Sequence, residues 1–425
     1  MKNTNRTNNW FWFILISELI IWQIGAIYIG FIKPLLTHTA IAFICSNSVS
    51  IIDFVIYYAA GRIAISSDSH RIYDPQIQLS WTNKLIAPLH IDHAFYFQYG
   101  PHILPLLIPL ALFSLETAYV IWACLGLLFG IFGSIVLLKY LGWTRRETAL
   151  FVLALVPSLP SILALKEGQL SWYFIGFITL YIWCLIKSRN ILAGFILALM
   201  SVKPHYSIFF ALPALAYKRW HLIISFIVVE LILFLIAGNY VGWENIWSYP
   251  AVIRAAEINS NYMGVAAENM VCIRALLIQY LTPALALKLS LLATALSVIF
   301  VSILWLIAKK NDNIASPLAL WTMTITVIAC LTFSAHAHIH DTLLLAVPAM
   351  LTLNVRNSRG NPLSGWLYNW QWLFITFPFT SWLLLWAAEA SNIFKISFFA
   401  FLMILFICAL WQYKKLFATS FPYHI

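Results

Sequence analysis

Charged side chains are scarce in this chain: Asp, Glu, Lys and Arg together make up 9% of its 425 residues. About a quarter of an ordinary soluble domain is charged, so this shortage excludes a soluble globular protein. Hydrophobic residues instead supply 62% of the chain. Apolar runs of about 20 residues, long enough to cross a bilayer, recur along it. The composition predicts an all-α polytopic membrane protein.

Cysteine pairs, internal repeats and low-complexity tracts are also missing. The cysteines form no Cys-x-x-Cys pair and no spacing typical of a disulfide framework. They are Cys45, Cys124, Cys184, Cys272, Cys330 and Cys408. Because most of them stand inside apolar runs, we interpret them as small buried hydrophobic residues.

Acidic residues are outnumbered, 15 against 25 Lys and Arg, and the basic residues gather in clusters. In a membrane protein such an excess encodes orientation, so no nucleic-acid partner is expected. After the first ten residues the clusters lie at 139–146, 187–189, 218–219, 309–310, 356–359 and 414–415. Placing all of them in the cytoplasm gives about twelve crossings with both termini cytoplasmic. The predicted spans lie near 10–32, 117–138, 148–163, 170–187, 190–201, 205–217, 221–238, 283–308, 316–333, 341–354, 366–386 and 395–412.

The ends and loops of this map carry further expectations. The N-terminal apolar stretch is too long for a signal peptide and lacks a cleavage site, so it is an uncleaved first helix. Segment 101–114 must be a half-helix or an interfacial helix, since a further span would reverse every later loop. Two long extracytoplasmic loops remain, 33–100 and 239–282, within a single domain covering 1–425. The first contains two stretches that read as amphipathic interfacial helices, "SIIDFVIYYAAGRIAI" and "YDPQIQLSWTNKLIAPL".

Polar residues near the membrane fall at the outer ends of spans or in the outer loops. Charged groups there cost several kcal/mol unless they are paired or hydrated, so they are candidates for function. The candidates are Asp53, Tyr57, Tyr58, Gln98, Gln169, Lys203, His205, Asn269, Arg274, His340 and Asp341. Together they predict a polar site that opens to the outer leaflet.

Asp53 has two readings, as a helix N-cap and as a general base beside aromatic rings. Gln169, in "KEGQ", either belongs to a helix-linking turn with a Lys–Glu pair or hydrogen-bonds substrate hydroxyls. Lys203, in "KPH", is an interfacial anchor or neutralises a phosphate at the start of the next helix, and we favour the phosphate. In "FQYGPH", at the junction of a loop and a helix, Gln98, Tyr99 and His102 could line a pocket.

The stretch "SAHAHIHD", 334–341, alternates histidines in a way that at first suggests a metal site. As a strand it would place His336, His338 and His340 on one face, whereas a helix N-terminus would pair only His336 with His340. A further ligand is missing from the nearby sequence. A structural interpretation, in which interfacial histidines cap a short loop, also stays open.

In order along the chain, "DFVIYYAAGR", "YDP", the proline-rich segment after "QYGP", "GQ", "KP" and a late "HD" form a pattern. It resembles the bacterial polyprenol-phosphate-mannose-dependent alpha-mannosyltransferases, glycosyltransferase family 87 of the GT-C superfamily. The resemblance spans about 50–345 and implies a GT-C-type fold in the bacterial plasma (inner) membrane with an extracytoplasmic active site. His205 and Ser171 depart from residues common in the family, Gln and Asn, and leave sugar and acceptor identity open.

The resemblance implies a hexosyltransferase that moves a sugar from a polyprenyl-phosphate donor to a lipid or glycan acceptor. Asp53 would be the catalytic base, and Lys203, His340 and Arg274 would bind the donor phosphate. The remaining candidates, Tyr57, Tyr58, Gln98, Gln169, His205, Asn269 and Asp341, would contact the substrates. Inverting single displacement from a lipid phosphate needs no metal cofactor. The rivals are a transporter or flippase for lipid-linked sugars, which predicts inverted repeats, and an inactive scaffold.

Overall fold

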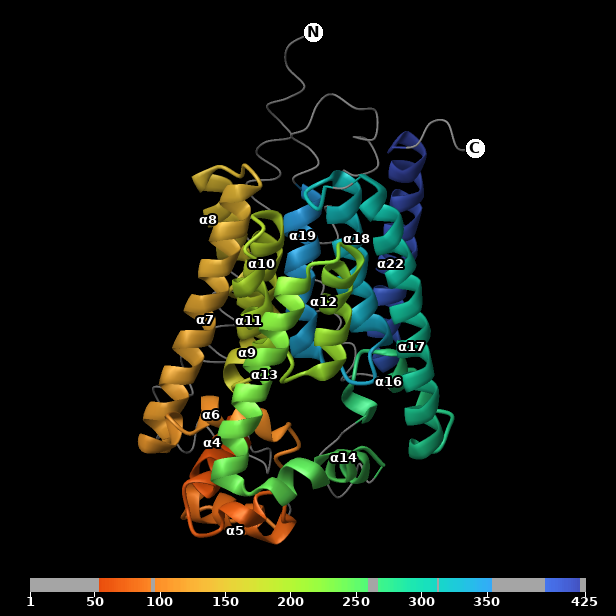
Figure 1. Cartoon of the computed structure of the whole chain (residues 1–425). Coiled ribbons are helices and arrows are strands. Elements are labelled where there is room, and N and C mark those ends of the chain that lie inside the picture. Colours follow the sequence, from red (N-terminus) through yellow and green to blue (C-terminus); the bar gives the residue numbers. More distant parts are fainter. Residues whose placement is uncertain (1–52, 93–95, 259–266, 312, 354–393, 421–425) are drawn as a thin grey trace, which may run out of the picture.

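The computed structural model describes residues 53–92, 96–258, 267–311, 313–353 and 394–420, and every regular element in these ranges is helical (Figure 1). The β-sheet pattern is limited there to one isolated bridge between Met270 and His338. The expectation of an all-helical chain is therefore confirmed for the part that the structure describes.

Within this part, three helices are long and apolar enough to cross a membrane alone: α7 (Leu115–Tyr140), α13 (Trp220–Val241) and α17 (Pro283–Ala308). A bent pair, α8 (Arg145–Leu155) and α9 (Leu159–Glu167), can form a fourth span with a 62° bend. The long helices expose aliphatic side chains such as Leu128, Ile224 and Leu296. Lipid accommodates such a surface and water does not, so this is a membrane protein.

Shorter apolar helices fill the interior between the long ones. They are α10 (Ser171–Ile186), α11 (Asn190–Met200), α12 (Pro204–Ala216), α18 (Pro317–Phe333) and α19 (Ala346–Leu353), and the longer α22 (Phe394–Ser420) packs on α18. α10 packs between α7 and α11, and α18 between α17 and α22. Gly133 permits close approach of α7 to α10, because a Cβ there would lie 2.4 Å from the Thr179 hydroxyl oxygen.

The helix boundaries follow the predicted spans closely from 117 to 333, with a break inside the span predicted at 148–163. Segment 101–114 is no span: it forms the short turns η3 (Pro101–Ile103), α6 (Leu104–Leu107) and η4 (Leu110–Leu112), as expected. The spans predicted at 10–32 and 366–386 lie outside the described residues. The total of about twelve crossings stays a prediction.

The first predicted loop folds differently from the expectation for its first helix. We expected 50–65 to be amphipathic, but α4 (Asp53–Ala64) is buried on nearly all sides against α5 (Pro75–Ile86), α6 and α7. Its small residues explain this burial: a Cβ at Gly61 would lie 2.9 Å from the Leu107 carbonyl oxygen. α5 is the outer helix, and it begins at the N-cap Asp74, which accepts the Gln76 N–H at 2.9 Å.

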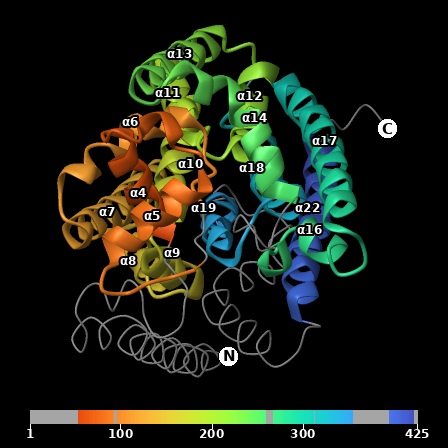
Figure 2. The ribbon, with the colours of Figure 1, turned by 90° about the horizontal axis from the view of Figure 1, so that it is seen from below.

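The two ends of the helix bundle differ in chemistry. α4, α5 and α14 (Trp243–Ile258) lie together at one end, as Figures 1 and 2 show. At the other end Lys187 covers the ring of Tyr140 with its Nζ 4.7 Å from the ring centroid, and Arg219 donates to Ser188 at 3.1 Å. The described parts of the two predicted outer loops and the basic residues Lys187 and Arg219 therefore occupy opposite ends.

The five cysteines within the described ranges are free thiols. Cys184, Cys272 and Cys330 are buried as expected, and Cys408 is partly buried. Cys124 is exposed on α7, which corrects the expectation of burial for that residue. Its surroundings on a membrane-crossing helix are still apolar. Cys45 lies outside the described residues.

Candidate functional site

A cluster of charged side chains forms where four separate elements meet. Asp53 begins α4, Glu167 ends α9, Lys203 precedes α12, and His340 and Asp341 lie in η7 (Ile339–Leu345). α9 packs on η7, and Gly168, at φ +68°, lies against Phe54, because a Cβ there would be 2.5 Å from the Phe54 Cβ. A left-handed glycine therefore lets the end of α9 approach the start of α4.

Lys203 and Asp341 form the centre of this cluster. The Lys203 Nζ donates to Asp341 Oδ1 at 2.6 Å, and the two side chains are only 5% and 1% exposed. The other carboxylate oxygen of Asp341 accepts the backbone N–H of His338 at 3.0 Å, which caps the start of η7. Buried charges of this kind persist only when paired and hydrogen-bonded.

The imidazole of His340 lies between two carboxylates. Its Nδ1 is 3.4 Å from Glu167 Oε2, and its Nε2 is 3.6 Å from Asp341 Oδ2. These separations are longer than those of short hydrogen bonds. A chain of polar side chains thus runs from the partly exposed Glu167 through His340 to the buried Lys203–Asp341 pair.

Asp53 is partly buried at the start of α4 and is within electrostatic reach of the same groups. Burial raises the pKa of Asp53 from 3.8 to about 7, and the nearby Glu167 carboxylate adds to the increase, whereas His340 and Lys203 oppose it. A carboxyl group with a pKa near neutrality can accept a proton in the physiological range. The N-cap reading gains no support from the hydrogen bonds around α4, none of which involves the Asp53 side chain within the described ranges.

Aromatic residues and backbone carbonyls surround the Asp53 end of this cluster. Tyr57 and Tyr99 share a hydrogen bond of 2.7 Å between their hydroxyl groups. Burial raises the pKa of both phenols, so both remain protonated and able to donate. Trp122 donates its indole N–H to the Gly168 carbonyl at 2.8 Å and so fixes the turn after α9.

Not every candidate points toward the charged cluster. Tyr58 donates to the Phe113 carbonyl at 2.7 Å, which is a packing role between α4 and the segment after η4. Gln98 is partly buried, and its backbone carbonyl accepts a hydrogen bond from the Tyr249 hydroxyl at 3.1 Å. Gln169 is 7% exposed, and its Oε1 has no hydrogen-bond partner within the described part of the chain. That oxygen is a free acceptor two residues after Glu167.

Arg274 belongs to a second polar group, formed with Glu257 of α14. Its guanidinium is fully buried in α16 (Ile273–Leu277) and pairs with the Glu257 carboxylate and, at 2.8 Å, with the Glu257 carbonyl. Burial alone would raise the pKa of Glu257, but His336 and Arg274 together lower it to about 2. Because Arg274 already has a carboxylate partner, less of its charge is available to a phosphate. Asn269, in η5 (Ala267–Asn269), is exposed.

The histidines of 334–341 link these two polar groups. The ring centroids of His205 and His336 are 5.9 Å apart, those of His336 and His338 4.9 Å, and those of His338 and His340 5.6 Å. His338 precedes η7 in extended backbone, so the helical pairing of His336 with His340 is wrong. Among the described residues no three His, Cys, Asp or Glu side chains are arranged to hold a metal ion.

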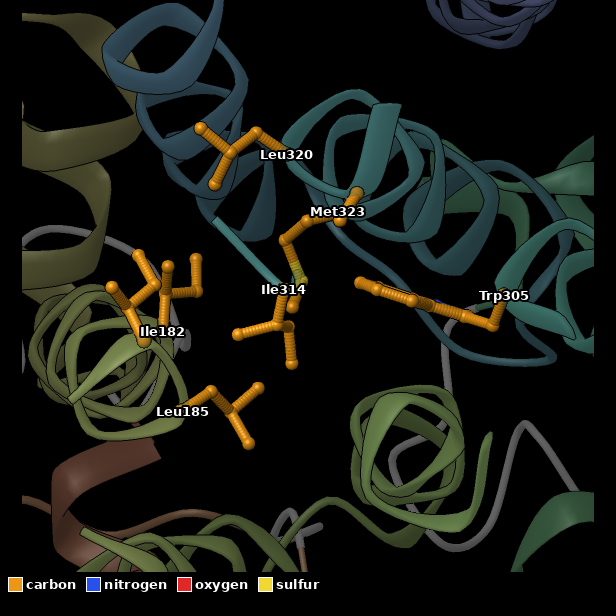
Figure 3. A pocket seen from close by; sticks show the side chains of 8 residues that line it. Ile182, Leu185, Trp305, Ile314, Leu320 and Met323 are labelled. Atoms are coloured by element: carbon orange, nitrogen blue, oxygen red, sulfur yellow. The ribbon is translucent and has the colours of Figure 1, made fainter. Parts of the chain in front are cut away.

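A small pocket lies at the opposite end of α10 from the charged cluster (Figure 3). Its lining is wholly apolar and includes Ile182, Leu185, Trp305 and Met323. It has no group that could activate or bind a polar substrate. The charged cluster, by contrast, contains such groups.

Sequence reasoning missed two residues of the two polar groups: Glu167 and Glu257. Glu167 is adjacent to the "GQ" pair, and its neighbour Lys166 suggested a surface ion pair instead. Tyr99, which was expected with Gln98 to line a pocket, lies against Tyr57. Glu257 is part of no motif, so only the fold could reveal its contact with Arg274.

Comparison with known families gives one match. Residues 97–334, more than half of the chain, match the model of glycosyltransferase family 87. No curated protein matches the chain. The matched range includes Glu167 and Lys203 but excludes Asp53, His340 and Asp341. The fold places these outlying residues against the matched ones.

Proposed function

Because the chain belongs to glycosyltransferase family 87, a GT-C family, we propose that it transfers a sugar from a polyprenyl-phosphate donor to a lipid or glycan acceptor. Family membership makes the protein a glycosyltransferase, with a sugar donor and an acceptor as substrates. It argues against the transporter and the inactive scaffold. The hexosyl and mannosyl-like specificity, and the polyprenyl carrier, are our proposal.

One observation carries the proposal: a carboxyl group with a pKa near 7, Asp53, lies within electrostatic reach of a buried lysine and an imidazole, Lys203 and His340. Asp53 accepts the proton of the acceptor hydroxyl while that oxygen attacks the anomeric carbon. The bond from this carbon to the phosphate oxygen breaks, and the configuration inverts. The bonding electrons leave with the polyprenyl phosphate, which gains one negative charge.

The leaving phosphate is stabilised by the cationic side of the same cluster. Lys203 and His340 supply the positive charge, and Arg274 contributes at longer range because it is paired with Glu257. The unpartnered Oε1 of Gln169 accepts a hydrogen bond from a sugar hydroxyl, and the rings of Tyr57 and Tyr99 border the sugar. His205, Asn269, Gln98 and Asp341 are assigned to substrate contact or its support, with no metal cofactor required.

The proposed topology places this site outside a bacterial plasma membrane, with both termini and the basic clusters in the cytoplasm. The charged cluster and the basic end of the molecule lie at opposite ends of α10, in support of this orientation. Single cysteines in place of Ser188 and Asp92 test it. Only the cysteine at 92 should react with a membrane-impermeant thiol reagent in intact cells.

The function is tested by transfer from a panel of synthetic polyprenyl-phosphate sugars to membrane lipid extract, with products analysed by mass spectrometry. Asp53→Asn keeps the shape of the side chain and removes the base, so turnover should fall at least about a hundredfold. Asp92→Asn, an exposed aspartate of the same loop, is the matched control. Undiminished turnover by the Asp53 variant would refute the proposed base.

A further inference from the structure

Glu167 differs from the other members of the charged cluster in its exposure. Its side chain is 37% exposed, against 7% for His340 and 1% for Asp341. Asp341 is held by Lys203 and by the His338 N–H, so it cannot leave without breaking a buried ion pair. Glu167 can rotate into water at little cost. Of the two carboxylates that face His340, only Glu167 is replaceable.

The charges of the cluster do not favour an anionic ligand as they stand. The carboxylates of Asp53, Glu167 and Asp341 lie around one ammonium group, that of Lys203, and around the imidazole of His340, on which His338 stacks. A phosphate that approached His340 would meet the Glu167 carboxylate at the same nitrogen. Two anions that close repel each other strongly in a partly buried site.

We propose that Glu167 is a displaceable anion on the Nδ1 of His340: its carboxylate holds the position that the donor phosphate takes, and it moves away when the donor binds. This inference rests on the proposed function, because it takes the donor to be a lipid phosphate. Glu167 then sets how tightly the donor binds, since each binding event must overcome the contact between Glu167 and His340.

The test measures binding of polyprenyl phosphate, without a sugar, to the purified full-length chain in lipid nanodiscs. Glu167→Gln removes the competing charge but keeps the size of the side chain, so the Kd should fall about tenfold. Glu167→Asp retains the charge and should bind with nearly the wild-type Kd. Glu116→Gln is the matched control, because Glu116 is a partly buried glutamate in the first turn of α7.

Each outcome decides a separate point. Tighter binding by Glu167→Gln alone, with an unchanged melting temperature, supports displacement. Equal or weaker binding by this variant overturns it, because Glu167 would then serve to orient the His340 ring. If the wild-type chain neither binds polyprenyl phosphate nor transfers from any polyprenyl-phosphate sugar, the proposed donor is wrong and this inference is overturned with it.

Discussion

The pH dependence of transfer offers the most direct measurement of the environment of Asp53. The base must be ionised to accept a proton, and its pKa of about 7 places half of the molecules in the active form at that pH. On this basis kcat/KM should fall to about a tenth of its plateau at pH 6 and reach about nine tenths at pH 8. An unperturbed aspartate would show no loss in this interval.

A substitution at Glu167 separates the causes of the increase in pKa. Burial is the larger cause and the Glu167 charge the second, so Glu167→Gln should lower the pKa of Asp53 and move the acid limb of the profile to lower pH. At pH 6 the variant should therefore keep a larger share of its own plateau than the wild type. Initial rates of radiolabelled sugar transfer between pH 5 and 9 provide the profile. If the acid limb of the variant's pH profile stays at the wild-type pH, or moves to higher pH, the electrostatic reasoning is refuted.

Further predictions concern stability. Above pH 7, Asp53→Asn should stabilise the fold by up to about 4 kcal/mol, because the ordinary pKa of 3.8 lies below the folded value of about 7 and ionisation between the two values disfavours folding. Thermal unfolding at pH 8 should show the gain, and at pH 4 most of it should vanish. Lys203→Met leaves Asp341 buried without its partner and should cost about 3 kcal/mol, whereas Lys203→Met with Asp341→Leu should recover most of this loss without recovering activity. Denaturant titration in detergent measures both, and an equally unstable double variant would contradict the argument. Gly168→Ala places a Cβ 2.5 Å from the Phe54 Cβ on a residue with φ +68°, so it should lower the free energy of unfolding by about 2 kcal/mol and lower the transfer rate. An unchanged melting temperature and unchanged turnover would show that Phe54 moves aside without cost.

The helices of this protein were predictable because bilayer thickness and basic clusters constrain them directly. Apolar runs longer than a dozen residues have few alternatives to a helix in lipid, and α17 begins and ends where the sequence predicts. The burial of α4 was not predictable in this way. Its apolar residues lie all around the helix, and only the packing of α5, α6 and α7 shows that every face is covered.

The sequence predicted which residues form the candidate site better than it predicted which of them contact one another. Motifs brought Asp53, Lys203 and Asp341 into one hypothesis, and the fold places them together. The sequence contains no signal that pairs Lys203 with Asp341, or Glu167 with His340, because these partners lie on elements far apart in the chain. The pairing of Arg274 with Glu257 was missed for the same reason, and so its expected phosphate role is weaker than the charge alone suggested.

The Lys203–Asp341 pair has a consequence for biosynthesis. Its two partners are 138 residues apart, so ribosomes synthesise Lys203 and its flanking helices well before Asp341 exists. Under the proposed topology, a nascent chain carries throughout that interval an unneutralised lysine at the edge of the bilayer, which is costly there. A chain truncated before 341 never acquires the partner. It presents to membrane quality-control proteases a charge that the complete protein conceals.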